Sequence, residues 1–148
     1  MSEKDVKPKV LISAAASPAA VSLVRHLREK GFYIIGMDAN PDAAPMGASV
    51  CDEFIMSPMA TDSRYVKFLS DRLSDCDVFL PFIDEELSSI VDNFSSIDNR
   101  HKIMLSDCDS IKVCLDKISF QDFCIAHSIN VAPTANSVPA IYKPRHGR

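Results

Sequence analysis

The stretch KVLISAAASPAAVSLVRHLREKGFYIIGMD, residues 9–38, decides the fold. Its first part, residues 9–13, is a short apolar run typical of a buried parallel strand. Ser17 is a good N-cap and Pro18 a good first residue for the helix that follows. A second apolar run over 32–37 predicts another strand. Strand, helix and strand together make a βαβ unit, whose crossover should be right-handed.

The chain beyond this unit repeats the same alternation. Asparagine and prolines over 40–45 predict a loop after the second strand. Short apolar runs at 53–56, 77–82 and 102–105 then predict a third, fourth and fifth strand, with helical patterns between them. Strands that alternate with helices, with no long spacer, form a doubly wound and mostly parallel sheet. The sequence therefore predicts an α/β, Rossmann-like fold.

The rhythm changes at Asp116, where one helical pattern follows another directly. Residues 131–139 contain two prolines among small polar residues, which is typical of a connector. The last eight residues, IYKPRHGR (141–148), predict a terminal strand that places a lysine at the start of a basic, glycine-containing turn. We expect one domain over 1–115, and then a helix, a connector and a strand of a second domain over 116–148.

The composition is that of an ordinary soluble globular protein, with 47% hydrophobic and 24% charged residues. The net charge of -4 and the lack of a basic stripe argue against nucleic acid or an anionic membrane as a partner. The first nine residues are charged and lack the apolar run of a signal peptide, and no apolar stretch is long enough to cross a bilayer. We expect a cytoplasmic protein.

The cysteines and histidines form no pattern typical of a metal site. The five cysteines are an odd number, contain no CxxC pair, and none lies at zinc-ligand spacing with the four histidines. We expect reduced thiols, no disulfide and no metal ligands among these residues.

Ligands of a parallel α/β sheet gather at the carboxyl ends of its strands. Three groups are expected there: the turn 13–17, Asp38 with Asn40, and the acidic cluster 84–86. The turn precedes a helix N-terminus that suits an anion, but it lacks the glycines that a dinucleotide fingerprint needs for close approach to a pyrophosphate. Asp38 lies where a ribose-binding acid would lie, and local hydrogen bonding to the backbone explains it equally well.

Charged residues near two other helix starts have alternative interpretations as well. The acidic cluster could bind an amine, or Asp84 could cap its helix while the glutamates complement the helix dipole. Lys117 lies in the first turn of a helix capped by Asp116, where a cation opposes the dipole and a nearby anion would offset the cost. Lys143 in the terminal strand is a second candidate cation. Exposed lysines are common, so neither position is decisive alone.

The order of these motifs resembles the N-terminal part of an ATP-grasp enzyme, near the carbamoyl-phosphate-synthase-like carboxylate-amine ligases. The resemblance runs through VLISAAAS-P, DVFLPFIDEEL, CLDKISFQDFCIAHSINVAPT and IYKPRHGR. Its most specific parts are the Asp-Lys pair before an apolar helix and the terminal lysine strand. It implies a Rossmann-like pre-ATP-grasp domain to roughly Leu115, followed by the first helix and strand of an ATP-grasp domain.

The resemblance also implies roles for particular residues. Lys117 and Lys143 correspond to lysines that contact ATP phosphates in that family. None of the residues present is implied to be catalytic, and the Mg²⁺ ligands are expected further along than Arg148. The implied border of the acceptor-substrate site consists of Ser13, Ala14, Asp84 and Glu85.

The implied full-length protein is an ATP-dependent C–N ligase. It would activate a carboxylate as an acylphosphate for attack by an amine or similar nucleophile, with Mg²⁺ and lysines stabilising the transferring phosphoryl group. ATP and a small carboxylate would be its partners, and a homodimer is compatible with the sequence. We expect residues 1–148 alone to be inactive and to bind ATP very weakly, because the glycine-rich phosphate loop is expected after Arg145, where only Gly147 and Arg148 remain.

Two other functions are compatible with the residues. An NAD(P)-binding Rossmann domain of an oxidoreductase or epimerase would share the first βαβ unit and Asp38, although the missing glycines and the Asp-Lys helix count against it. A non-catalytic interaction module would tolerate the alanine-filled first turn.

Overall fold

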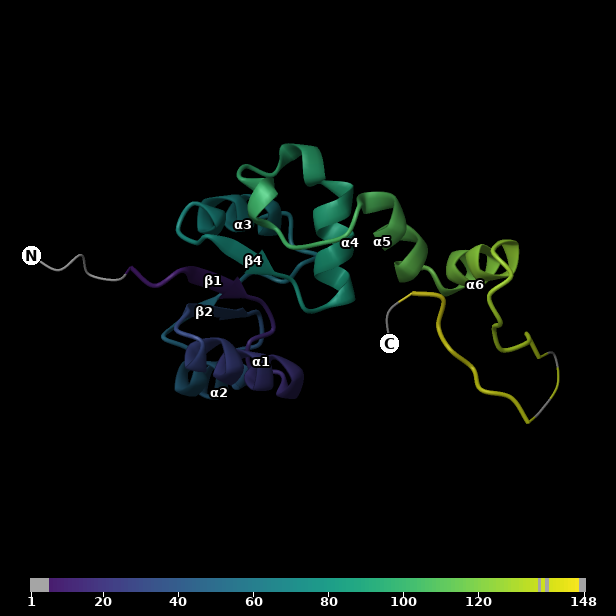
Figure 1. Ribbon diagram of the computed structural model, residues 1–148, viewed down its shortest axis with the longest axis horizontal. Helices are drawn as coiled ribbons and strands as arrows, with labels where there is room; N and C mark the ends of the chain where they lie inside the picture. Colours follow the sequence, from purple (N-terminus) through teal and green to yellow (C-terminus); the bar gives the residue numbers. More distant parts are fainter. Residues whose placement is uncertain (1–5, 136, 138, 147–148) are drawn as a thin grey trace, which may run out of the picture. The chain divides into compact units, whose positions relative to one another are not determined.

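The computed structural model describes residues 6–135, 137 and 139–146 (Figure 1). The chain forms two compact units, Met1–Leu105 and Ser106–Arg148. The predicted boundary between residues 115 and 116 places helix α5 (Cys108–Leu115) in the first domain, whereas the structure groups it with helix α6 (Lys117–Ala126) in the second unit. The two helices are separated by a single residue and pack on each other.

The first unit is built on a four-stranded parallel sheet in the order β3-β2-β1-β4. Val10 pairs with Ile34 of β2, and Leu11 with Phe79 of β4. The predicted βαβ unit and the α/β, Rossmann-like fold are therefore confirmed. The strands are β1 (Lys9–Ile12), β2 (Tyr33–Asp38), β3 (Glu53–Met56) and β4 (Val78–Leu80).

The helices of this unit cover both faces of the sheet (Figure 1). Helix α1 begins as predicted at Pro18, and the Ser17 hydroxyl accepts a hydrogen bond from the Ala20 amide at 3.2 Å. The predicted loop 40–45 is correct only at its start, because a 3-10 turn over Pro41–Ala43 leads directly into an unpredicted helix, α2. The α-helices are α1 (Pro18–Glu29), α2 (Ala44–Val50), α3 (Tyr65–Leu73) and α4 (Asp84–Asp92).

Two apolar clusters form the core, one on each face of the sheet. Val10, Ile12 and Ile34 pack with α1 and α2, whereas Leu11, Met37 and Phe79 pack with α3 and α4. A sheet that is covered on both faces explains why its strands are continuous apolar runs instead of alternating ones. None of the helices among the described residues is both long and apolar enough to span a bilayer.

The predicted fifth strand, 102–105, is wrong. In the described chain it is reduced to one parallel bridge between Phe79 and Ile103. Lys102 is part of a 3-10 turn, and its ammonium group donates to the Leu73 carbonyl at 2.7 Å and to a second carbonyl three residues later at 2.8 Å. The lysine thus satisfies the carbonyl of the last residue of α3 and a second carbonyl in the loop that follows.

The predicted terminal strand is not formed either. Residues 141–144 have no strand pairing, and the side chains of Ile141 and Tyr142 are 87% and 91% exposed. A strand needs a neighbour to satisfy its backbone groups. The described part of the second unit contains only the helices α5 and α6 and offers no such neighbour.

Candidate functional site

The strand order creates a point at which two neighbouring strands lead to opposite sides. From β1 the chain continues to β2 and β3 on one side, and β4 then adds to the other side of β1. Ligands of open parallel sheets bind outside the carboxyl ends of the strands at such a switch point. Two segments meet here, the turn 13–17 after β1 and residues 81–86 after β4, and the Ser13 amide donates to the Leu80 carbonyl at 3.3 Å.

A buried hydrogen-bonded pair ties these two segments together. The Ser13 hydroxyl donates to Oε2 of Glu86 and accepts from the Phe82 amide at 3.0 Å. Ser13 is completely buried, and Glu86 is only 5% exposed. Polar side chains remain inside proteins where hydrogen bonds satisfy them, so this pair fixes the two segments against each other.

The environment of Glu86 favours the uncharged acid. Burial raises the pKa of the Glu86 carboxyl, and the nearby charge of Asp38 acts in the same direction, against the opposing hydrogen bonds from Ser13 and Phe82. Tyr65, the first residue of α3, is also buried, and burial followed by the charge of Glu86 raises the pKa of its hydroxyl. The two side chains act on each other electrostatically, but the Tyr65 hydroxyl has no hydrogen bond of acceptable geometry to any described residue.

The turn after β1 has a glycine-like backbone without a glycine. Ala14 has φ 46°, in the left-handed region that costs a non-glycine residue about 1–2 kcal/mol. Its carbonyl accepts from the Ser17 amide at 2.8 Å, which leads the chain into α1. The glycine lies on the next strand instead: this turn packs closely against Gly36 of β2, where an added Cβ would lie 2.9 Å from Cβ of Ala15.

The predicted acceptor-site residues fall into two groups. Ser13 and Ala14 lie at the switch point, whereas Asp84 and Glu85 are exposed on the first turn of α4. The acid that contacts Ser13 is Glu86. Glu86 belongs to the predicted acidic cluster but is not among the predicted acceptor-site residues. The helical spacing held a clue, since Glu86 lies four residues before the buried Ile90 and so on the same face of α4.

The geometry bears on two further sequence interpretations. Asp84 does not cap α4: the N-cap is Ile83, which makes no side-chain capping bond, and Asp84 is the first helical residue. Asp38 accepts a hydrogen bond from the Asn40 amide at 2.9 Å, as the local interpretation predicts.

In the second unit, Asp116 caps α6 as predicted. Its Oδ1 accepts hydrogen bonds from the amides of Ile118 at 2.9 Å and Ser119 at 3.2 Å. Lys117 is the first residue of the helix, and Lys143 is exposed. The structure therefore places one candidate lysine at a capped helix start and the other in a segment without regular secondary structure.

The second carboxylate oxygen of Asp116 holds the end of the described chain, which the sequence did not predict. Nε and Nη2 of Arg145 donate to Oδ2 of Asp116 at 2.8 and 2.5 Å. The Lys117 amide donates to the Arg145 carbonyl at 3.1 Å, and Nδ1 of His146 lies 3.3 Å from the Leu115 carbonyl. We call this set of contacts the Asp116–Arg145 clasp. The hydrogen bonds from Arg145 hold the pKa of Asp116 well below its usual range.

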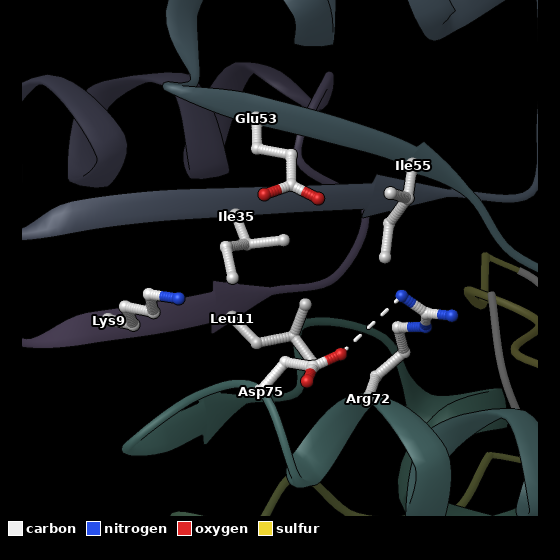
Figure 2. Close-up of a pocket in the computed structure, with 7 residues that line it drawn as sticks. All are labelled: Lys9, Leu11, Ile35, Glu53, Ile55, Arg72 and Asp75. Atoms are coloured by element: carbon white, nitrogen blue, oxygen red, sulfur yellow. Dashed lines mark ion pairs between the residues drawn. The ribbon is translucent and has the colours of Figure 1, made fainter.

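A surface pocket of about 250 Å³ lies over the amino ends of the strands (Figure 2). Lys9 and Glu53, the first residues of β1 and β3, border it. Arg72 and Asp75 across the pocket pair with each other at 3.6 Å. The pocket is thus at the edge of the sheet opposite to the switch point. Two of the charged side chains that line it, Arg72 and Asp75, form an ion pair with each other.

The side chains that could bind a metal ion are not grouped together among the described residues. These residues contain no group of three or more His, Cys, Asp or Glu side chains placed to hold an ion. All five cysteines are free thiols, three of them buried.

Comparisons with known proteins agree with the fold and name a family. A search of the curated proteins gives no match. Among solved structures, Gre2 from Candida albicans is similar with a TM-score of 0.50 and 12% identity, over 63% of this chain and 34% of that one. A reductase engineered to attenuate substrate inhibition in asymmetric catalysis is similar with a TM-score of 0.50 and 9% identity, over 64% of this chain and 35% of that one. At such identities the likeness shows the fold alone, and the chain spans only about a third of these structures.

The family described as "PylC-like, N-terminal domain" matches residues 10–105. The matched stretch contains the sheet except its first residue, Lys9, together with the switch point and the Ser13–Glu86 pair. It ends where the first compact unit ends. The resemblance to ATP-grasp enzymes is thereby confirmed: this chain belongs to the PylC-like N-terminal domain family, the pre-ATP-grasp domain of ATP-grasp ligases.

Proposed function

We propose that this chain is the N-terminal part of an ATP-dependent C–N ligase. The enzyme would convert a small carboxylate to an acylphosphate, which an amine or similar nucleophile then attacks with release of phosphate. The observation that carries the proposal is the family match over residues 10–105, which covers the unit with the switch point.

The switch point supports an acceptor-substrate site in the first unit. The buried Ser13–Glu86 pair uses its polar atoms internally, so its role in our proposal is to shape the site. The exposed carboxylates of Asp84 and Glu85 lie one and two residues before Glu86. Carboxylates at this edge of the sheet suit an ammonium group of a substrate.

The phosphate side of the proposal lies in the second unit. Lys117 and Lys143 would bind and orient the phosphates electrostatically, without acting as nucleophiles. The donor set fits this role, because the clasp joins the backbone at residue 117 to that at residue 145. Bound Mg²⁺ would supply further charge stabilisation, and we assign its ligands to none of the described residues.

Trapping of the acylphosphate tests the proposal. The full-length protein, given ATP, Mg²⁺, hydroxylamine and a panel of small carboxylates, is expected to release ADP and to form a hydroxamate with at least one of them. Lys143→Ala should lose this activity with the fold retained. Lys112→Ala is the matched control, because Lys112 is an exposed lysine of the same unit and should be dispensable. Full activity of Lys143→Ala would contradict the role of that lysine.

The reductase alternative makes a different prediction. The similar solved structures share the fold, but the first turn here consists of alanines, and Ala14 takes the conformation that favours glycine. We expect no fluorescence change with NADH or NADPH. Saturable NADPH binding without ADP release would contradict the ligase proposal and favour an oxidoreductase. For residues 1–148 alone we expect very weak binding of Mg-ATP, and micromolar affinity by calorimetry would contradict that expectation.

A further inference from the structure

We propose that Asp116 and Arg145 are a positioning pair, which holds the segments of Lys117 and Lys143 together as one phosphate-binding edge. The inference rests on the proposed function, since it takes the two lysines as ATP contacts. It adds two residues that touch neither ATP nor the reacting atoms and that act through the lysines beside them.

The two oxygens of the Asp116 carboxylate have different partners. Oδ1 of Asp116 is used by the first-turn amides of α6, and Oδ2 by two nitrogens of Arg145. Charge-assisted bonds from two nitrogens of one guanidinium fix its direction as well as its distance. Asp116 therefore fixes the start of α6 and the position of Arg145 with the same side chain.

The backbone also links the two segments. First-turn amides of a helix have no partner within the helix, and here the Lys117 amide finds one in the Arg145 carbonyl at 3.1 Å. Only Pro144, whose φ is fixed by its ring, separates Lys143 from Arg145. Two residues span at most about 7 Å, so the Lys143 backbone must stay within that distance of the clasp.

The pair also has an electrostatic role. The negative charge of Asp116 would repel an incoming phosphate and compete with it for nearby ammonium groups. The Arg145 guanidinium neutralises that charge from the side of the terminal segment. The pair is partly exposed, with 56% of the Arg145 side chain accessible, and such pairs add little to stability. Its loss should therefore affect phosphate binding more than folding.

Steady-state kinetics of the full-length ligase test the inference. Arg145→Met is expected to raise the KM for ATP about tenfold, the size expected for loss of a charge-assisted contact, with a much smaller change in kcat. Arg145→Lys keeps the charge without the two-nitrogen fork and should recover part of the affinity. Asp116→Asn keeps the capping oxygen, and the double variant with Arg145→Met should be no worse than Arg145→Met alone.

A comparable arginine elsewhere provides the control. Arg64 donates to Asp62 through Nε at 2.9 Å and Nη2 at 2.6 Å, but in the loop before α3. Arg64→Met removes an ion pair of the same kind and should leave the KM for ATP unchanged. An equal rise of KM in both variants would overturn the inference, because the effect would then be a general one of charge.

The lysine variants distinguish a failure of the positioning role of Arg145 from a failure of the phosphate-binding role of the lysines. If Lys117→Ala and Lys143→Ala raise the KM for ATP and Arg145→Met does not, the positioning role is overturned and the proposed function stands. If the lysine variants leave the KM unchanged, the phosphate-binding role fails and the inference fails with it. An NMR titration provides a readout independent of ATP: Arg145→Met should raise the pKa of Asp116, and an unchanged value would show that the clasp does not form.

Discussion

Two carboxylates at helix starts, Glu86 in the first unit and Asp116 in the second, meet opposite environments. Each binds a partner far along the chain, Ser13 at a separation of 73 residues and Arg145 at 29. Glu86 is buried beside a neutral hydroxyl, and its pKa is raised. Asp116 is partly exposed beside a guanidinium, and its pKa is lowered. The comparison shows that burial and the charge of the partner, not the position on the helix, decide which form the fold stabilises.

The two shifts have opposite consequences for stability. The folded state favours the protonated Glu86, so its contribution is fully present below the ordinary carboxyl pKa and is lost as pH rises through the raised value. The folded state favours the ionised Asp116, so its contribution is present above the ordinary pKa and is lost as pH falls through the lowered value. A rise of pH above the ordinary carboxyl value therefore weakens the first site, and acid weakens the second.

The largest expected effect comes from deleting the buried acid. Glu86→Ala leaves the Ser13 hydroxyl without its acceptor inside the protein and opens a small cavity, which should lower the free energy of unfolding by about 2–3 kcal/mol. Urea unfolding monitored by circular dichroism measures the change. Glu85→Ala, an exposed neighbour on the same turn, should cost about 0.5 kcal/mol or less. Equal losses in the two variants would mean that Glu86 is not buried.

A neutral replacement separates the charge of Glu86 from its hydrogen bonds. Glu86→Gln keeps an oxygen that can accept from Ser13 and cannot ionise. The stability of the native chain should fall relative to this variant as pH rises above 4.5, the ordinary value for the carboxyl, and the two should converge in acid. Melting temperatures from pH 4 to 8 give the comparison, with Glu85→Gln as the control. A pH-independent difference would contradict the raised pKa.

The strained turn beside Ser13 should respond in the opposite direction. Ala14→Gly removes the left-handed penalty of about 1–2 kcal/mol and adds a smaller entropy cost in the unfolded chain, so the first unit should gain roughly 0.5–1 kcal/mol. Chemical denaturation measures the gain. Ala19→Gly, on exposed helical backbone near the start of α1, should instead destabilise by about 0.5–1 kcal/mol. Loss of stability in Ala14→Gly would contradict the left-handed conformation.

These contrasts also show what a sequence can reveal. The βαβ unit was predictable because apolar runs, Ser17, Pro18 and turn residues all favour the same local structure. The spacing of Glu86 to Ile90 indicated a buried position, but the contact of Glu86 with Ser13 was not predictable, because the two residues lie 73 positions apart. The clasp was hidden for the same reason, since the Arg145 guanidinium meets Asp116 only in the folded chain. Local capping at Asp116 was predictable, and its second partner was not.

The smallest expected effect on stability is at Asp116, and its pH dependence should run in the direction opposite to that at Glu86. Arg145→Met removes the partner that lowers the pKa of Asp116, while the amides of Ile118 and Ser119 still favour the ionised form. The native chain should therefore lose its advantage over this variant as pH falls below 3.8, the ordinary value for the carboxyl, and the two should differ only slightly at pH 7. Salt should shrink even that difference, because 56% of the Arg145 side chain is accessible to solvent, whereas the Glu86→Gln comparison should be nearly insensitive to salt. Melting curves at low and high ionic strength test both statements, and a salt-insensitive effect of Arg145→Met would place the clasp in a buried environment like that of Glu86.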